Sequence, residues 1–329
     1  MVKRALMVLS IVSASPLFAD DSTQPTDSYH SPLSLSTELE ASYLYNSNLN
    51  IDALDRSSGS RDSAMRTRAA VNADWRSTGS VGINGGYSVL SDNYREVDAF
   101  DTLTQLANIG VSIKRGGVIG GFSYHYADVR LDGDHFLELQ RPALYVGILM
   151  SAQWYWRVDW VGQNKDFDQL DAYDADHRSV GGTIYHFYRT DSFISLGATT
   201  EKEDAVDTTL DYSGWATHLV WRHSLRGFDR STSVNLSWQH AKRDYRSHSS
   251  TTEMPVGTPL GGLIGSTSVT TVTSTQRLDR SDIYTVSADT LLTDVLHVTC
   301  SVQYSDNRSN LDSADYDQWL STVGVKLVF

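Results

Sequence analysis

From residue 33 to residue 329, apolar and polar residues alternate in short runs. The first run, 33–45, divides into an apolar and a polar face, formed by Leu35, Leu39, Ala41, Tyr43 and Tyr45 and by Ser36, Glu38, Glu40 and Ser42. Successive side chains of a β-strand point to opposite faces, so a period of two predicts strands that separate two environments. We therefore expect an all-β chain.

The same alternation recurs at intervals throughout the chain. Each of the later runs places every second, mostly apolar residue on one face. The runs extend from Ala69 to Trp75, Val81 to Val89, Ala107 to Ile113, Phe122 to Tyr126, Leu144 to Met150, Trp154 to Trp160, Ile194 to Ala198, Trp215 to Trp221, Val234 to Trp238, Tyr284 to Val286 and Val298 to Tyr304. The run 180–187 has no clear phase, because Tyr185, His186 and Phe187 load both faces. Our count is about 14 strands, an even number, as in an antiparallel transmembrane β-barrel of a Gram-negative outer membrane.

The joints between the runs alternate in length. Short joints fall near 77–79, 115–117, 151–152, 190–191, 225–230 and 293–294, and long polar joints at 46–63, 90–101, 127–134, 163–174, 200–210, 242–280 and 305–315. Short periplasmic turns and longer external loops are typical of outer-membrane barrels. The 242–280 joint contains a Ser/Thr/Val run, which could form a small hairpin, a lid inside the lumen or a surface loop.

The last strand, 318–329, ends in an aromatic residue. Trp319, Val323, Leu327 and Phe329 share its apolar face, while Gln318, Thr322, Gly324 and Lys326 share the other. Such a strand resembles the C-terminal signal by which barrel proteins are recognised for insertion into the outer membrane. We therefore assign Phe329 to the assembly signal and expect the barrel-insertion machinery as a partner.

The N-terminal residues resemble a secretory leader. Lys3 and Arg4 precede the apolar run 5–12, and Ala19 offers a small residue at the cleavage position. The expected organisation is a signal peptide over 1–19, a short periplasmic segment over 20–32 and a transmembrane barrel over 33–329. No apolar run of the mature chain is long enough for a membrane-spanning helix.

Composition and charge agree with a barrel. The mean hydropathy is −0.31, yet the chain has 17 Tyr, 8 Trp and 9 Phe, enough for the aromatic girdles of a barrel, whose strands hide their hydrophobicity by alternation. A net charge of −13 argues against nucleic-acid binding, which needs a basic surface. The acidic loops would face outer-membrane lipid and lipopolysaccharide. The single cysteine, Cys300, excludes an internal disulfide and fits a small lipid-facing residue.

No catalytic or cofactor-binding pattern is present in the sequence. His125, His186, His218 and His240 lie on separate strands without a glycine-flanked serine, so we expect no enzyme activity. Asp166, Asp168, Asp171, Asp174 and Asp176 alternate like ligands of a hard cation, but the glycine and terminal glutamate of a calcium loop are missing. The sequence predicts neither a cofactor nor a metal site.

Short motifs at successive strand ends carry a family resemblance. They are Lys165-Asp166-Phe167, Glu203-Asp204-Ala205, Arg243-Asp244-Tyr245 and the run 304–310. Their order resembles the C-terminal barrel of the surface lipoprotein assembly modifiers and related barrels that follow tetratricopeptide repeats, over most of residues 33–329. The resemblance implies a role in export or surface-protein assembly. The helical repeat domain of that family has no counterpart in these 329 residues, so client capture would need a separate periplasmic partner.

A barrel of this size is wide enough for a solvated lumen. The charged residues expected to line it are Glu38, Glu40, Arg66, Arg68, Asp74, Arg76, Lys114, Arg157, Asp159, Arg222, Asp289 and Lys326. The leading functional hypothesis is a channel or porin for small polar or charged solutes; the alternative is an export or surface-protein assembly barrel. A structural or adhesive barrel is less favoured, because the inward faces are rich in Gly and Ser rather than in bulky residues.

Overall fold

The computed structural model of the chain describes residues 32–329, apart from 52–55, 78–79, 228–229, 247 and 256–267. The predicted signal peptide, 1–19, and all but the last residue of the predicted periplasmic segment, 20–32, lie outside the described residues. The predicted barrel segment lies almost entirely within them.

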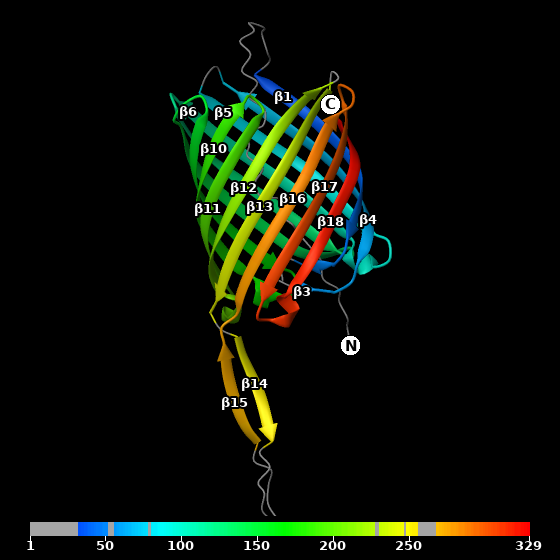
Figure 1. Cartoon of the computed structure of the whole chain (residues 1–329), viewed down its shortest axis with the longest axis vertical. Coiled ribbons are helices and arrows are strands. Elements are labelled where there is room, and N and C mark those ends of the chain that lie inside the picture. The colour runs from blue at the N-terminus through cyan, green and yellow to red at the C-terminus, as the bar shows by residue number, and fades with distance from the viewer. Residues whose placement is uncertain (1–31, 52–55, 78–79, 228–229, 247, 256–267) are drawn as a thin grey trace, which may run out of the picture.

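Fourteen antiparallel strands form one closed barrel, as the alternation predicts (Figure 1). Neighbouring strands follow the chain order, and the barrel closes between the first and last strands, β1 and β18. The strands are β1 (Leu33–Asn46), β4 (Asp62–Arg76), β5 (Val81–Tyr94), β6 (Thr102–Arg115), β7 (Val118–Leu131), β8 (Asp134–Leu149), β9 (Trp154–Phe167), β10 (Ala175–Arg189), β11 (Ser192–Ala205), β12 (Tyr212–Gly227), β13 (Arg230–Tyr245), β16 (Leu278–Leu291), β17 (Leu296–Ser309) and β18 (Tyr316–Val328).

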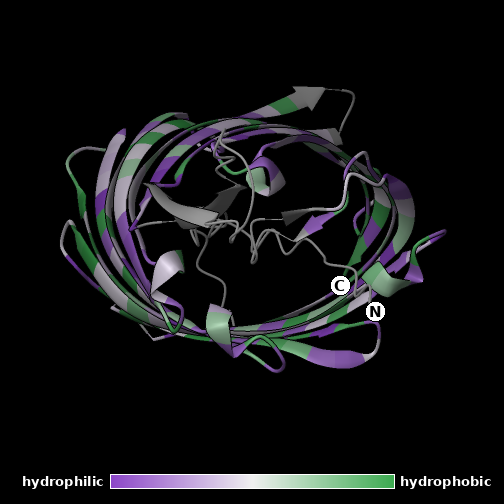
Figure 2. Cartoon of the chain, turned by 90° about the horizontal axis from the view of Figure 1, so that it is seen from below, coloured by the Kyte–Doolittle hydropathy of each residue, from purple (hydrophilic) through white to green (hydrophobic). Residues whose placement is uncertain are grey.

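The predicted apolar face is the outer face of the barrel. Leu35, Val146, Val158 and Val323 are each more than half exposed, as expected of side chains that face lipid. Apolar and polar bands alternate along the strands when the barrel is viewed along its axis (Figure 2). The ambiguous run in β10 is also resolved, because Val180 and Ile184 point outward and the odd-numbered residues between and after them point inward.

The seam between β1 and β18 includes the last residue of the sequence. Leu39 pairs with Leu327, and Tyr43 pairs with Val323. Phe329 exchanges two main-chain hydrogen bonds with Thr37, of 3.0 and 2.9 Å. Phe329 therefore helps to close the ring of strands, and its side chain is 62% exposed on the outer face.

The strands are longer than predicted at the end of the barrel where the long joints were expected, which we call the long-loop end. The predicted joint 127–134 is a two-residue turn, Asp132-Gly133, and the predicted joint 163–174 begins only after Phe167. Positive φ angles at Asp132 and Gly133, of 52° and 82°, fit a tight hairpin turn, for which Asp-Gly is a strong sequence signal. Beyond the lipid both faces of a strand are wet, so the alternation that marks a strand disappears there.

Three connections at the long-loop end share one design. A single 3₁₀ turn follows each strand and ends at an aspartate, whose carboxylate accepts a hydrogen bond from the backbone N–H of the last residue of that strand. The 3₁₀ turns are η2 (Asp98–Phe100), η3 (Asp171–Tyr173) and η4 (Thr208–Leu210), and the acceptor–donor pairs are Asp101 and Tyr94 at 2.6 Å, Asp174 and Phe167 at 2.7 Å, and Asp211 and Ala205 at 2.7 Å. The carboxylate satisfies a main-chain donor that the barrel ladder leaves unpaired.

Smaller elements complete the long-loop end. The β1–β4 connection contains a short ladder, β2 (Asn50–Ile51) with β3 (Arg56–Ser57), and η5 (Asp312–Ala314) precedes β18. The predicted 242–280 joint contains a hairpin, β14 (His248–Pro255) with β15 (Ser268–Thr275), as in the first of its three proposed forms (Figure 1). Among the described residues, no helix is long and apolar enough to cross a membrane.

Candidate functional site: the inner wall of the barrel

All twelve residues predicted to line the lumen occupy inward positions of their strands. The residues of the opposite phase in the same strands, such as Leu39, Val158 and Val323, are exposed on the outer face. The position of each residue is thus as expected, whereas its influence on solutes stays a prediction.

Seven of these residues, together with Asp92, which was not among the predicted residues, form four ion pairs. Arg66 donates two hydrogen bonds to Asp92, of 2.6 and 2.7 Å, and Arg68 donates one of 3.0 Å to Glu38. On other strands, Arg157 Nε lies 2.6 Å from Asp159, and Lys326 Nζ lies 2.6 Å from Asp289. The pairs hold fixed charges on the wall while neutralising one another, so the electric field that they produce in the lumen is weaker than that of separated charges.

The inner ion pairs keep access to solvent. The side chains of Glu38 and Arg68 are 27% and 37% exposed, and those of Asp289 and Lys326 are 32% and 21% exposed. His297 also reaches the second oxygen of Asp289, at 2.6 Å. Asp92 and His297 lie at inward positions and could have been found by extending the alternation to every strand.

The remaining predicted residues have different surroundings. Asp74, Arg76 and Lys114 are exposed near the opposite end of the barrel, where the short turns lie, which we call the short-turn end. Glu40 and Arg222 are half-buried at inward positions. In the part of the chain that the structure describes, the side chains of Glu40, Asp74, Lys114 and Arg222 form no ion pair within 4 Å. Fixed charges without a partner act on a passing ion more strongly than paired ones, so these four are the better candidates for selectivity.

A second polar cluster braces the long-loop end. Lys165 Nζ lies 2.7 Å from Glu203, which also accepts a hydrogen bond from Tyr212, while Arg243 lies 3.1 Å from Glu201. His177 Nδ1 lies 3.4 Å from Glu203. Carboxylates and cations are balanced across five neighbouring strands, and the side chains of Glu203 and His177 are only 11% and 14% exposed. We interpret this cluster as a structural network that ties the wall together.

Another part of the long-loop end is apolar inside, contrary to the expectation from the sequence. Leu44, Leu137, Leu139 and Phe167 point inward from the wall and are at most 5% exposed. Leu49 and Phe100, from the connections after β1 and β5, pack into the same cluster. The expectation of Gly and Ser rather than bulky inward residues is therefore wrong for this end. Short-range alternation could not reveal it, because the cluster forms between connections and wall residues that are distant in sequence.

Inward glycines along the middle of the wall receive the side chains of neighbouring strands. A Cβ atom added to Gly147 would lie 1.9 Å from Tyr155 Oη, and one added to Gly121 would lie 2.5 Å from the ring of Tyr145. The rings therefore lie over the backbone of the adjacent strand instead of crossing the lumen. This packing lets large aromatic residues occupy an inner wall without filling the interior.

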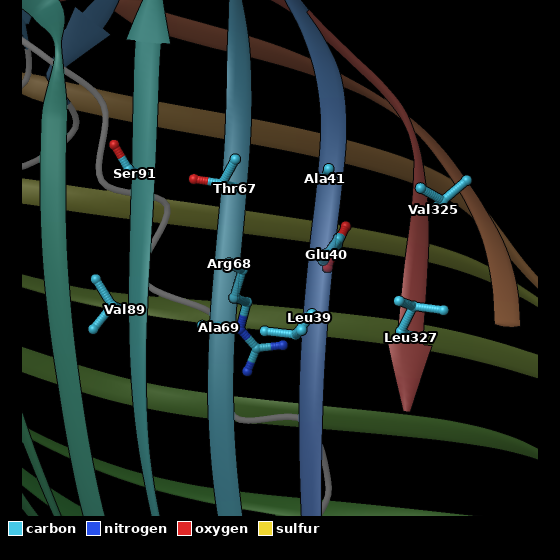
Figure 3. A pocket seen from close by; sticks show the side chains of 10 residues that line it. All are labelled: Leu39, Glu40, Ala41, Thr67, Arg68, Ala69, Val89, Ser91, Val325 and Leu327. Carbon is cyan, nitrogen blue, oxygen red and sulfur yellow. The ribbon is translucent and has the colours of Figure 1, made fainter. Parts of the chain in front are cut away.

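A depression of about 380 Å³ lies across β18, β1, β4 and β5 (Figure 3). Eight of its ten lining residues occupy outward positions, including Leu39, Ala41, Val89 and Leu327. It therefore belongs to the lipid-facing surface and not to the lumen.

The described residues contain no group of three or more His, Cys, Asp or Glu side chains placed to hold a metal ion. The aspartates that alternate near residue 170 have other roles. Asp174 closes the connection after β9, and Asn164 donates a hydrogen bond of 3.2 Å to Asp176.

No family model and no curated protein matches the sequence. A loop-deletion variant of OmpT, an outer membrane protein of Vibrio cholerae, matches the structure with a TM-score of 0.50 at 8% identity, covering 91% of this chain and all of that one. The trimer form of the same OmpT has a TM-score of 0.50 at 8% identity, covering 90% and 99%. An anion-selective porin from Comamonas acidovorans has a TM-score of 0.48 at 11% identity, covering 90% and 99%.

The fold is that of an outer-membrane β-barrel. Closed antiparallel strands with a lipid-facing apolar band place the protein in the outer membrane of a Gram-negative bacterium. Identities this low show the fold alone. The resemblance to the surface lipoprotein assembly modifiers stays a prediction.

Proposed function

We propose that this barrel is a channel that passes small polar or charged solutes across the outer membrane. The observation that carries the proposal is a ring of fourteen strands whose inner face bears charged side chains that remain accessible to solvent, among them Arg68 and Lys326. Buried ion pairs alone would stabilise a wall, but partly exposed charges also interact with ions in a wet lumen.

We infer that the apolar cluster at the long-loop end narrows the route on that side. Leu44, Leu137 and Phe167 withdraw part of the wall from water, while the ionic network around Glu203 occupies the part formed by β9–β13. We infer a channel whose entrance is restricted at this end and whose selectivity is set by the inner charges below it. A restricted entrance favours small solutes over large ones.

Planar-bilayer conductance of the purified barrel tests the proposal. We expect discrete openings, and neutralising Arg66, Arg68 and Arg76 to Gln should move the reversal potential in a salt gradient toward cation selectivity, because Glu38 and Asp92 would lose their partners. Arg178→Gln is the matched control, because Arg178 lies on the outer face of β10. Equal shifts for the inner and outer variants would contradict a selective lumen.

A silent bilayer would favour the alternative, an export or surface-protein assembly barrel with a separate periplasmic partner. To separate a blocked channel from the absence of one, residues 248–275 should be replaced by a short turn, since β14 and β15 extend from the barrel as a unit of their own (Figure 1). No conductance after this replacement would reject the channel.

A further inference from the structure

Five inward aromatic residues of β8–β11 form one continuous surface on the inner wall, here called the lumenal aromatic patch: Tyr145, Tyr155, Tyr185, Phe187 and Phe193. Ring centroids lie 5.6 Å apart for Tyr155 and Tyr185, and 5.8 Å apart for Phe193 and each of Tyr185 and Phe187. Tyr185 and Phe187 are stacked at 6.2 Å with an interplanar angle of 10°. The run in β10 whose phase the sequence left open supplies two of the five rings.

The patch is not the girdle of a lipid interface, because its residues alternate with outward ones. Trp154, Trp156 and Ile184 occupy the outer face of the same strands and are 38–51% exposed. The rings of Tyr145 and Tyr155 pack over Gly121 and Gly147 of the neighbouring strands. In contrast, the rings of Tyr185, Phe187 and Phe193 stay partly exposed to the lumen. Aromatic surface left open on a wetted wall is costly unless a ligand covers it, and such surface commonly marks a binding site.

Cations border the patch. The guanidinium of Arg157 lies 4.1 Å from the centre of the Tyr145 ring and is paired with Asp159. Arg222 is the cross-strand neighbour of Phe193 and also points inward, but no carboxylate lies within ion-pairing distance of it among the described residues. Arg141, an inward residue of β8, likewise has no carboxylate within ion-pairing distance among the described residues.

The balance of charge favours an anion. The patch lies in the middle and the short-turn half of β8–β12. The described inward residues there include three positively charged side chains, Arg141, Arg157 and Arg222, and one negatively charged side chain, Asp159. A guanidinium without a partner binds a carboxylate through strong, charge-assisted hydrogen bonds. A neutral sugar would not need this surplus of positive charge, and an organic cation would be repelled by it.

We propose that the lumenal aromatic patch and Arg222 form a binding site for small aromatic carboxylates on their way through the lumen. The ligand ring stacks on Phe187 and Phe193, and its carboxylate meets the guanidinium of Arg222. Offset or edge-to-face contacts between rings add to the burial of apolar area. The inference rests on the proposed channel for its transport role, but the binding site itself can be tested without conductance.

Binding is measured first on the folded barrel in detergent, by equilibrium dialysis with radiolabelled benzoate and with acetate and benzyl alcohol as comparison probes. Benzoate should bind more tightly than either, since only benzoate offers both a ring and a carboxylate. Arg222→Gln should weaken benzoate binding about tenfold, the equivalent of one charge-assisted hydrogen bond. Phe193→Ala should weaken benzoate and benzyl alcohol but leave acetate unchanged, and the outer-face control Arg178→Gln should change none of them.

Channel block is measured second, in planar bilayers. Benzoate should reduce the single-channel current at concentrations where acetate does not, and Arg222→Gln should raise the concentration needed for half-block by a similar factor. Specific benzoate binding in a barrel that never conducts would reject the channel and leave the site standing. Equal binding of benzoate and acetate, or benzoate binding unaffected by both Arg222→Gln and Phe193→Ala, would reject the site.

Discussion

Asp101 shows what a single carboxylate contributes at the end of a strand. Its Oδ1 accepts a hydrogen bond of 2.6 Å from the N–H of Tyr94, a donor that the β5–β6 ladder does not use. Burial raises the pKa of Asp101, and the nearby carboxylates of Asp98, Asp132 and Asp62 raise it further, while the hydrogen bond from Tyr94 opposes them. The carboxylate oxygen of Asp101 therefore stabilises the fold as a hydrogen-bond acceptor, whereas its negative charge is destabilising.

Two substitutions separate these effects. Asp101→Ala should lower the free energy of unfolding by about 1–3 kcal/mol, because it leaves the N–H of Tyr94 without an acceptor. Asp101→Asn keeps an acceptor oxygen and removes the charge, so we expect it to be at least as stable as the parent at pH 7. Urea unfolding of the barrel in lipid vesicles measures both.

The pH dependence of the same pair has a definite sign. Because the folded-state pKa of Asp101 is raised, its contribution to stability is fully present below the unfolded-state pKa and is lost as the pH rises through the folded-state pKa. The difference in free energy of unfolding between Asp101→Asn and the parent should therefore shrink as the pH falls from 7 to about 4. An advantage that grows on acidification would show that the carboxylate is stabilised by its surroundings.

At the scale of the element, some strands are packed against a neighbour by side chains that fill glycine positions. Tyr155 of β9 lies over Gly147 of β8, and His218 of β12 lies over Gly197 of β11. Such pairs fix the register of adjacent strands in addition to the main-chain ladder, because the ring fits only where the neighbour has no Cβ atom.

Gly147→Ala should destabilise the barrel by about 1–3 kcal/mol through overpacking against Tyr155. Gly182→Ala is the matched control, since a Cβ atom there would meet only the carbonyl oxygen of Arg157, at an ordinary 3.8 Å. The double variant Gly147→Ala with Tyr155→Ala should recover part of the loss that the Gly147 variant shows. If Gly147→Ala and Gly182→Ala unfold at the same urea concentration, the ring does not act through this glycine.

The elements also show how far the sequence leads. Alternation predicted the strand number and the outward phase of residues such as Val158 and Val323, because lipid and water lie on opposite faces of the wall. It could not place Tyr185 and Phe187, since both faces of β10 carry aromatic residues there. The repeated segments Val97-Asp98-Ala99-Phe100-Asp101 and Leu170-Asp171-Ala172-Tyr173-Asp174 were a visible signal of the aspartate-closed connections and indicate a turn, not a metal site.

The interior was less predictable than the wall. The twelve charged residues were assigned to the correct face, but their pairing depends on which strands are neighbours and on their register. Arg66 reaches Asp92 on β5, and Lys326 reaches Asp289 on β16 across an intervening strand. The apolar cluster around Leu44 needs contacts between connections that only the closed barrel brings together.

At the scale of the whole molecule, Phe329 combines two properties that can be separated. Its main chain pairs with Thr37 at the seam, and its ring is exposed, where we predict that the insertion machinery recognises it. Phe329→Ala keeps the two main-chain hydrogen bonds and removes the ring. We expect less heat-modifiable, folded protein in the outer membrane of cells and nearly unchanged stability of the barrel refolded in vitro.

Val325→Ala is the matched control, because Val325 also points outward from β18 and is 48% exposed. If Phe329→Ala and Val325→Ala lower the amount of folded protein in cells equally, the ring is a lipid contact only. A loss of stability in vitro for Phe329→Ala alone would likewise place its role in the barrel and not in recognition.

The seam between β1 and β18 also sets the order of events during biosynthesis. During translation β1 emerges before every other strand of the barrel, yet one of its edges finds its partner only when β18 has left the ribosome. Until then that edge offers unpaired N–H and C=O groups to any other strand, including that of a second chain. Closing a loop of nearly the full chain is also entropically slow. We therefore expect the chain to depend on periplasmic chaperones that cover the edge of β1 during this delay.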